Sequence, residues 1–337
     1  MQFRKILHGL AAALMLLCLM RPAAAENNEI RLALQFSIGY LQLNVMQHQK
    51  LIEKHAAAVG IENAKVSWFK FNGPTAVNEA LISGNIDVGS GGVPGLLTLW
   101  ARTKGTPQEI RGVSALSSQP FLLNVNEARI KSIADFTDKD RIAVPAVKSS
   151  VQAMTLEMAA AKTFGVKNFE KLDPLTISMR PPDATVALLH GGGQITAVFG
   201  VPPFQYQMLE DKKVHTVLNS FDVMGGSHTF TAIWTSKKFR DGNPKMYQAF
   251  LAALKEATAI VAKDPAAAAK YWIEDSKSKL APEMVGKIVS GAQVHWTMVP
   301  ENTMKFADFM AQVGRIKTKP ASWKDYFFPE IYDRKGS

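Results

Sequence analysis

Along the sequence, short runs of alternating apolar and polar residues are followed by longer segments in which apolar residues recur every three or four positions. In the first part of the chain the alternating runs predict strands at 29–35, 64–71, 86–89 and 110–116. The helical spacing predicts helices at 41–59, 77–82 and 95–102. Because strands and helices alternate, this part is expected to form an α/β domain with a largely parallel sheet.

The same alternation continues in the middle of the chain and then gives way to helices. Strands are expected at 121–126, 141–145, 175–179 and 195–199, and helices at 151–164, 183–190 and 204–210. A strand at 229–235 is expected to return the chain to the first part. The remainder predicts helices at 246–263, 265–275, 282–290 and 301–313, followed by an aromatic tail at 323–332 that packs back onto a lobe.

The first 25 residues have the pattern of an export signal. Arg4 and Lys5 precede an apolar run of about 15 residues, shorter than the roughly 20 that span a membrane, and Ala23-Ala24-Ala25 follows. We expect cleavage after Ala25 and a soluble exported protein. The single cysteine, Cys18, leaves with this segment, which excludes cysteine catalysis and cysteine-bound metals in the mature chain. Export without disulfides favours a bacterial periplasm.

The charge balance gives little support to a nucleic-acid partner. The net charge of +10 falls to about +7 without residues 1–25, which contain three basic residues and no acidic one. Basic residues are scattered, and no run exceeds two. We therefore expect no nucleic-acid binding and only a modest preference for anionic ligands.

Loops rich in glycine, serine and asparagine follow four of the predicted strands. They lie at 35–40, 72–75, 89–94 and 117–119. In sheets of this type ligands bind beyond the carboxyl ends of the strands, and the helix starts there offer unpaired N–H groups to a polar or anionic group. These loops are the candidate binding loops.

Four segments together resemble a known family. They are Asn72-Gly73 with Glu79-Ala80-Leu81; Gly84-Asn85-Ile86-Asp87-Val88-Gly89; Ile133-Ala134-Asp135-Phe136 with Arg141-Ile142-Ala143-Val144; and Pro182-Asp183-Ala184 with Ala187-Leu188. The chain resembles the periplasmic substrate-binding proteins of ABC importers, in the nitrate, sulfonate, taurine and thiamine-pyrimidine group. It departs from the family pattern at Thr196, where an acidic residue is usual.

This resemblance implies a fold, a partner and a location. The fold is a two-lobed α/β periplasmic binding protein of type II, in which each lobe has a mixed sheet flanked by helices and two hinge strands join the lobes. Residues 26–120 and 228–337 would form a discontinuous lobe 1, and 121–227 would form lobe 2. The protein would be a periplasmic monomer that closes on a small-molecule ligand and delivers it to an ABC permease in the inner membrane.

The resemblance also implies which residues face the ligand. These are Phe36, Ser37, Tyr40, Asn72, Ser90, Gly91, Ser117, Ser118, Ser149, Ser150, Gln152, Gly200 and Val201. They offer hydroxyls, amides and aromatic rings but no Arg or Lys. A sulfonate or carboxylate held by serines and helix starts is the expected ligand, and a neutral or zwitterionic ligand such as a pyrimidine or taurine remains open. Whether Trp68 and Phe199 contact the ligand or only pack in the core also remains open.

Catalytic and metal signatures are absent from the sequence. His190-Gly191-Gly192-Gly193 resembles an oxyanion-hole motif, but no G-x-S-x-G nucleophile motif accompanies it. The histidines lack metal-ligand spacing. We expect no catalytic residue, metal or cofactor. Two alternatives remain: an enzyme on the same fold that resembles thiamine-pyrimidine synthases, and the ligand-binding subunit of a periplasmic sensor.

Overall fold

The computed structural model describes residues 26–337, so the expected signal peptide lies outside the described residues. The strands form two separate sheets, of which the larger has six strands in the order β11-β4-β10-β3-β1-β2. These strands are β1 (Glu29–Leu34), β2 (Lys65–Lys70), β3 (Val88–Gly91), β4 (Ile110–Ser118), β10 (Thr229–Ser236) and β11 (His295–Trp296). β1 is parallel to β2 and β3, whereas β10 is antiparallel to β3 and β4, so the sheet is mixed.

The smaller sheet is built only from the middle of the chain. Its five strands have the order β7-β6-β8-β5-β9. They are β5 (Leu122–Val125), β6 (Ile142–Val144), β7 (Thr176–Ser178), β8 (Ala197–Phe199) and β9 (His215–Asn219). β6 is parallel to β7 and β8, and β5 is antiparallel to β8 and β9. This sheet is mixed too.

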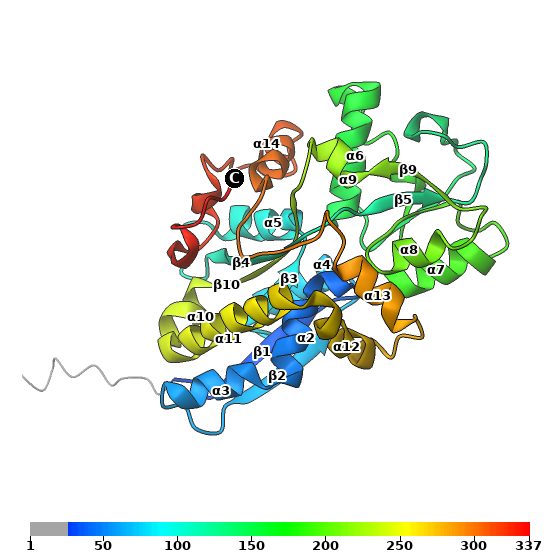
Figure 1. Cartoon of the computed structure of the whole chain (residues 1–337). Helices are drawn as coiled ribbons and strands as arrows, with labels where there is room; N and C mark the ends of the chain where they lie inside the picture. Colours follow the sequence, from blue (N-terminus) through cyan, green and yellow to red (C-terminus); the bar gives the residue numbers. More distant parts are fainter. Residues whose placement is uncertain (1–25) are drawn as a thin grey trace, which may run out of the picture.

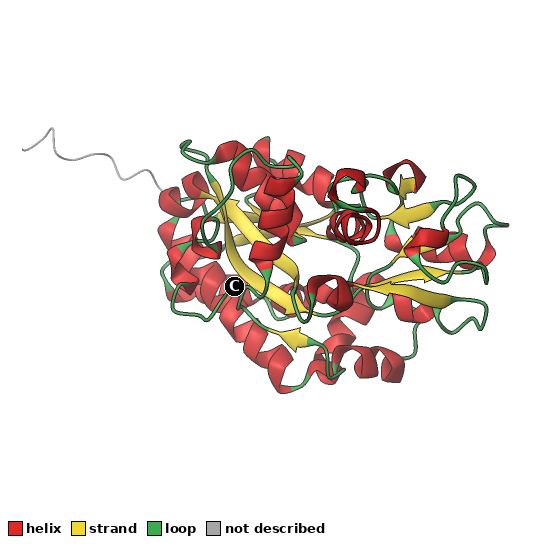
Figure 2. Cartoon of the chain, turned by 90° about the horizontal axis from the view of Figure 1, so that it is seen from above, coloured by secondary structure: helices red, strands yellow, loops and turns green. Residues whose placement is uncertain are grey.

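Helices surround both sheets, and Figure 2 shows the two sheets side by side with helices around each. Around the larger sheet lie η1 (Ile38–Tyr40), α2 (Leu41–His48), α3 (Leu51–Ala58), α4 (Pro74–Ile82), α5 (Val93–Thr103), α10 (Lys237–Gly242), α11 (Pro244–Lys263), α12 (Pro265–Ser276), α13 (Pro282–Val289), α14 (Thr303–Gln312), η5 (Trp323–Asp325) and η6 (Pro329–Ile331) (Figure 1). Around the smaller sheet lie η2 (Ile133–Asp135), α6 (Val151–Phe164), η3 (Val166–Asn168), η4 (Asp173–Leu175), α7 (Pro181–His190), α8 (Phe204–Met208) and α9 (Ser220–Met224).

This architecture confirms the two-lobed α/β fold expected from the sequence. We call the part around the larger sheet lobe 1 and the part around the smaller sheet lobe 2. The chain crosses from one sheet to the other between β4 and β5 and returns between β9 and β10. The lobe limits at 121 and 227 stay a prediction. No helix among residues 26–337 is long and apolar enough to cross a membrane.

The helix expected at 41–59 is wrong as a single element. The structure breaks it into α2 and α3 at Lys50, whose φ of 50° lies in the left-handed region. A left-handed residue cannot continue a right-handed helix. The hydrophobic spacing misses the break because Leu51 and Ile52 continue the buried face after it.

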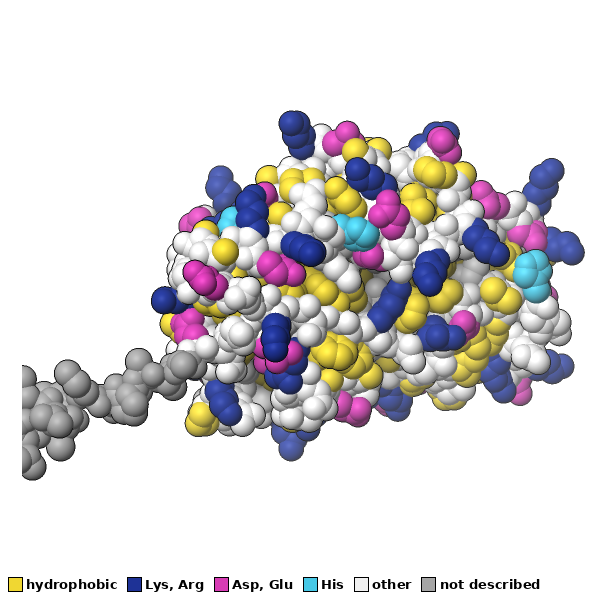
Figure 3. Space-filling view, turned by 90° about the horizontal axis from the view of Figure 1, so that it is seen from below, with side chains coloured by type: hydrophobic (Ala, Val, Ile, Leu, Met, Phe, Trp, Pro, Cys, Tyr) yellow, Lys and Arg dark blue, Asp and Glu magenta, His cyan; other side chains and the backbone are white. Residues whose placement is uncertain are grey.

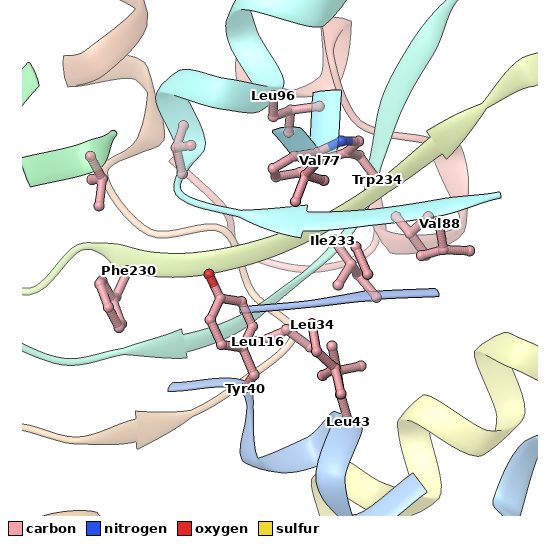
Figure 4. Packing of buried hydrophobic residues seen from close by; sticks show 14 of the residues in the cluster. Leu34, Tyr40, Leu43, Val77, Val88, Leu96, Leu116, Phe230, Ile233 and Trp234 are labelled. Carbon is pink, nitrogen blue, oxygen red and sulfur yellow. The ribbon is translucent and has the colours of Figure 1, made fainter. Parts of the chain in front are cut away.

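The glycines of β3 are required by one tryptophan of lobe 1. Trp234 on β10 pairs with Gly89 and is fully buried between helices and sheet, beside Val77 and Leu96 in Figure 4. A Cβ on Gly89 would lie 2.4 Å from the indole nitrogen of Trp234, and one on Gly91 would lie 2.8 Å from its ring. The glycine-rich run after the second predicted helix therefore makes room for a core side chain.

The aromatic tail packs back onto lobe 1, as the sequence predicts. Tyr326 and Phe327 are fully buried, and the rings of Trp100 on α5 and Tyr326 lie 5.9 Å apart. The backbone N–H of Gly112 on β4 donates to the carbonyl of Tyr326 at 2.8 Å. The end of the chain thus closes the outer side of the larger sheet.

Buried aromatic rings join the two segments that cross between the sheets. Phe121 precedes β5 on the first crossing, and its ring centroid lies 5.5 Å from that of Phe230 on the returning strand β10. Phe199 at the end of β8 and His228 pack against Phe121 at 5.2 and 5.4 Å. All four side chains are almost completely buried. The two crossings therefore share one small core.

A chain of hydrogen bonds runs through the same core. The Phe121 N–H donates to Ser220 Oγ at 3.1 Å, and Ser220 Oγ lies 3.0 Å from His228 Nε2. His228 Nδ1 lies 3.0 Å from the Thr229 carbonyl, which can only accept, so Nδ1 carries the proton and Nε2 accepts from Ser220. Burial lowers the pKa of His228 to about 4, so the imidazole is neutral at pH 7.

This buried histidine predicts a loss of stability in mild acid. Because the folded pKa is about 4 and the unfolded one 6.5, the unfolded chain binds a proton between these values that the folded protein does not. Stability from this group is present above pH 6.5 and is lost as the pH falls toward 4. Its share should be about 2 kcal/mol smaller at pH 5 than at pH 7, measured by urea unfolding.

The matched variant is His228→Gln, which keeps hydrogen-bonding atoms without titrating in this range. It should lose stability at pH 7 but should show a shallower fall in unfolding free energy from pH 7 to 5 than the parent. An equal fall in both proteins would contradict the assignment of this pH dependence to His228.

Candidate functional site

The two lobes touch each other directly along one edge. Ser37 Oγ donates to the Pro202 carbonyl of lobe 2 at 2.9 Å, and the Ile38 N–H donates to the same oxygen at 3.1 Å. Thr75 Oγ1 and Ser149 Oγ lie 3.0 Å apart across the lobes. The structure therefore has a closed arrangement.

A second contact between the lobes lies away from this edge. Arg315 follows α14, which packs against α5 of lobe 1, and its guanidinium binds three carboxylates of lobe 2. The Nη2 atom lies 2.6 Å from Glu157, 2.9 Å from Glu170 and 3.2 Å from Asp173. Burial raises the pKa of Glu157 to about 7, and the arginine opposes this shift. The ion pairs hold the lobes together at a second place.

About 400 Å³ of space, part of it open to solvent, lies between the lobes, and we call it the cleft cavity. Both lobes line it, through the ends of strands and the starts of helices. Its lining residues are Gln35, Phe36, Ser37, Tyr40, Asn72, Pro74, Gly92, Pro145, Ser150, Val151, Gln152, Pro181, Val201 and Phe230.

Four helices begin at the wall of this cavity. Pro74 is the first residue of α4, Gly92 precedes α5, Val151 is the first residue of α6 and Pro181 is the first of α7. Proline has no N–H, so α7, which begins with two prolines, lacks its first two donors, whereas α4 keeps the N–H groups of Thr75 and Ala76 and α6 keeps those of Val151 and Gln152. Ser150 caps the next N–H, that of Ala153, at 3.2 Å. The starts of α4 and α6 can therefore both attract a negative group, and α6 is the longer helix, with 14 residues against nine.

Side-chain donors complete the wall. The Tyr40 hydroxyl and the Asn72 amide have no hydrogen-bond partner within residues 26–337. Burial raises the pKa of Tyr40, so its hydroxyl keeps the proton that it can donate. Figure 4 shows this hydroxyl directed toward β10, on the side of Phe230.

The structure brings together seven of the thirteen residues predicted to face the ligand. The residues that line the cleft cavity are Phe36, Ser37, Tyr40, Asn72, Ser150, Gln152 and Val201. They lie in the loop after β1 and in η1, in the loop after β2, at the start of α6 and in the loop after β8. The strand-end loops singled out from the sequence do meet at one cavity, although the role of these residues in binding stays a prediction.

Six predicted residues lie outside this lining, and each has another structural role. Ser90 Oγ donates to the Ala33 carbonyl at 2.8 Å, and Gly91 lies against Trp234. Two further serines form hydrogen bonds between hydroxyl groups. Ser117 Oγ lies 2.7 Å from Thr231 Oγ1, and Ser118 Oγ lies 2.7 Å from Ser227 Oγ. Ser149 binds Thr75 across the lobes, and Gly200 lines a separate apolar cavity inside lobe 2.

Two cations next to the cleft cavity escaped the sequence analysis. The Lys70 ammonium lies 4.6 Å from the centroid of the Phe36 ring, and the Arg180 guanidinium lies 5.9 Å from it. Lys70 belongs to lobe 1 and Arg180 to lobe 2. Both sit at element ends next to predicted binding residues, Lys70 before Asn72 and Arg180 before Pro181. Their place next to these residues was the only feature of the sequence that could have identified them as site residues.

The chemistry of the cavity is polar, aromatic and free of acidic side chains. None of the lining residues is Asp or Glu. Three of them are aromatic, namely Phe36, Tyr40 and Phe230. Within residues 26–337 no group of three or more His, Cys, Asp and Glu side chains is placed to hold a metal ion. Such a site suits a small organic molecule with a negatively charged end.

The face of the molecule drawn in Figure 3 shows no concentration of charge of one sign. On the face drawn in Figure 3, Lys and Arg side chains are spread over the whole view and are interspersed with Asp and Glu. This face has no continuous basic strip of the kind that follows a nucleic-acid backbone.

Comparisons with known proteins identify the family. The NMT1-like family matches residues 23–273. The chain belongs to this family. A comparison with curated protein sequences gives no match.

Solved structures of the same fold include three named as binding proteins. The alkanesulfonate-binding protein SsuA from Xanthomonas axonopodis pv. citri, bound to MOPS, is 20% identical, with a TM-score of 0.68 over 88% of this chain and 96% of that one. The aliphatic sulphonate binding protein SsuA from Escherichia coli is 18% identical, with a TM-score of 0.64 over 91% and 99%. The nitrate-binding protein NrtA from Synechocystis PCC 6803 is 15% identical, with a TM-score of 0.66 over 89% and 84%.

These names agree with two expectations from the sequence. The resemblance to the nitrate and sulfonate group of periplasmic binding proteins is confirmed by the family and by these neighbours. All three neighbours are binding proteins, as we expect for this NMT1-like protein in preference to an enzyme. At these identities the likeness shows the fold.

The closed arrangement predicts the effect of one added methyl group. A Cβ on Gly92 of lobe 1 would lie 2.5 Å from the Cβ of Val151 in lobe 2, so Gly92→Ala should hold the lobes apart. We expect the affinity for the ligand to fall about tenfold or more, by titration calorimetry, because closure completes the site. The control is Gly242→Ala, because Gly242 has no atom within 4 Å of the added Cβ. Equal affinities of the two variants would contradict the closed contact.

Proposed function

We propose that this NMT1-like protein is the periplasmic solute-binding component of an ABC importer and that its ligand is a small organic anion. A sulfonate or carboxylate end would lie at the start of α6, and the organic part would lie against the aromatic rings of the cleft cavity. Closure of the two lobes would sequester the ligand and present one combined surface to a permease. The protein would act as a monomer.

The observation that carries this proposal is the start of α6 inside a cavity without acidic residues. The N–H groups of Val151 and Gln152 are the first two of a helix of 14 residues with no acidic side chain in its first turn. Gln152 is buried, at 2% exposure, so its surroundings contain little water to screen the field. The hydroxyl of Tyr40 and the amide of Asn72 add donors from lobe 1.

The names of the structural neighbours support the same ligand class. Two neighbours are named for binding sulfonates and one for binding nitrate, and all of these ligands are oxyanions. We infer the organic part from Phe36, Tyr40 and Phe230. Aromatic rings bind apolar groups, and a small inorganic anion has none. The neighbours named as periplasmic also support a periplasmic location.

A ligand screen tests the proposal. Residues 26–337 are titrated with alkanesulfonates, carboxylates, nitrate, taurine and pyrimidines, and thermal unfolding is followed. A ligand at 100 times its dissociation constant should add about 2.7 kcal/mol of stability and should be recovered unchanged. Binding of pyrimidines alone would overturn the anion proposal, and conversion of a ligand to product would overturn the assignment as a binding protein.

Tyr40 supplies the matching prediction for a single side chain. Tyr40→Phe should lower the affinity for the anion about five- to tenfold, because one hydrogen bond to a charged group is lost. Stability without ligand should change little, since no described residue bonds the hydroxyl.

The control for this variant is Tyr247→Phe. The Tyr247 hydroxyl is buried without a hydrogen-bond partner within the described part of the chain, and it does not line the cleft cavity. Its removal should leave the affinity unchanged and should not lower stability. If both variants bind as tightly as the parent, Tyr40 has no role in binding.

A further inference from the structure

A second chamber adjoins the cleft cavity on the side of lobe 1. It contains about 560 Å³ of empty space, part of it open to solvent, between the ends of β1 and β2 and the helices α2 and α12. Gln35 and Ser37 line both the cleft cavity and this chamber, so the two spaces adjoin at these residues. We call this space the side chamber.

The side chamber continues outward into a third space. This outer cavity has about 700 Å³ of empty space and shares Lys70, Trp272 and Ser276 with the side chamber and Phe36 with the cleft cavity. Phe204 of lobe 2 and Leu280, just before α13, also line it. Figure 1 shows α13 next to α7 and α8 at this place. The three spaces therefore lie next to one another around Phe36, Gln35 and Ser37.

One cation in the side chamber has no counter-ion. Lys70 at the end of β2 lines the chamber, and its ammonium forms no salt bridge within residues 26–337. Its closest recorded partner is the face of the Phe36 ring. Loss of solvation lowers the pKa of Lys70, and Asp275 partly opposes this shift. The Lys70 side chain is exposed overall, so its ammonium lies at the solvent-facing side of the chamber, where it can attract an anion that enters from the cleft cavity.

The only carboxylate in the lining of the side chamber is already engaged. Asp275 accepts hydrogen bonds on both oxygens, from Asn44 Nδ2 at 2.6 Å and from His48 Nε2 at 2.6 Å. The Asn44 side chain is 5% exposed, and its Oδ1 has no partner within the described residues. The chamber thus holds one positive charge, at Lys70, and one negative charge, at Asp275, which is held by Asn44 and His48.

Two tryptophans give the side chamber apolar faces, whereas its other lining residues apart from Leu34 are polar. Trp68 on β2 and Trp272 on α12 line it, and Phe36 lies at the passage from the cleft cavity. The rings of Phe204 and Trp272, from different lobes, lie 6.3 Å apart and close the outer side. Flat apolar walls of this kind hold a hydrocarbon linker between two polar ends.

We propose that the ligand is elongated and carries two negative groups, one at the start of α6 in the cleft cavity and a second, a carboxylate or a similar anion, beside Lys70 in the side chamber. This inference rests on the proposed function, because it assumes that the first anion lies in the cleft cavity. Lys70 is then a specificity-determining residue that selects α,ω-dianions over molecules with one charged end. The hydrocarbon part of the ligand lies along Phe36 and the two tryptophans.

Pairs of ligands that differ only in the second charge test the proposal. Hexanesulfonate is compared with its ω-carboxylated derivative, and hexanoate with hexanedioate, by titration calorimetry on residues 26–337. The parent should bind the dianion of a pair at least fivefold more tightly than the monoanion. In Lys70→Met this preference should fall to about one, because the charge that the second anion meets is gone.

The control is Lys65→Met, at the other end of the same strand. Lys65 begins β2 and is exposed, as Lys70 is, but it does not line the cleft cavity, the side chamber or the outer cavity, so this variant should keep the preference of the parent. Melting temperatures of all three proteins show whether Lys70→Met is folded. The ligand pairs on the parent test the proposal even without that variant.

The outcomes separate this proposal from the proposed function. Monoanions and dianions that bind the parent equally well overturn the side-chamber site but leave anion capture in the cleft cavity intact. A preference that survives Lys70→Met overturns the role of Lys70. If no anion of the series binds while a pyrimidine does, the proposed function and this inference fail together.

Discussion

The buried contact between Phe121 and Phe230 joins the two segments that link the lobes, and the rest of the structure depends on it. Because one ring lies on the outgoing segment and the other on the returning strand β10, the two crossings cannot separate without exposing both. The hydrogen bonds from Phe121 through Ser220 to His228 also restrict how these segments can be oriented. Since buried polar groups are costly without partners, the network fixes the local backbone at the crossings.

This fixed core sets what the edge between the lobes can do. With the crossings held, the helix starts of α4 and α5 in lobe 1 face those of α6 and α7 in lobe 2, around one cavity. The fit is tight enough that a single methyl group on Gly92 would collide with Val151. The ion pairs of Arg315 hold the far side of the same interface. A site assembled from two lobes in this way is complete only when they are closed, which is what capture of a ligand requires.

The order of the elements could be predicted from the sequence, because hydrophobic spacing reports which face of each element is buried. Proline at the start of α12 and glycine after α6 also marked helix ends correctly. The break at Lys50 could not be predicted, since a left-handed lysine leaves no trace in the hydrophobic pattern. The antiparallel position of β10 in the larger sheet depends on pairing between distant segments, which spacing does not encode.

The site was predictable only in part, for a related reason. Loops at strand ends do meet, so Phe36, Tyr40, Ser150 and Gln152 could be found from their position in the pattern. Ser90 and Gly91 occupy a similar loop, but their surroundings are set by Ala33 and Trp234, which are remote in sequence. Lys70 lies near Phe36 because β1 and β2 pair in lobe 1, and Arg180 lies near it because the two lobes close on each other. Contacts of that kind follow from tertiary packing.

Small-angle X-ray scattering of residues 26–337, with and without a saturating anion, tests most directly the claim that the closed lobes form the site. The account predicts that the radius of gyration falls on binding to the value calculated from the closed structure, because the lobes without ligand spend time apart. A ligand that binds tightly while the radius of gyration stays above the closed value would show that closure is not part of binding, and would contradict the account.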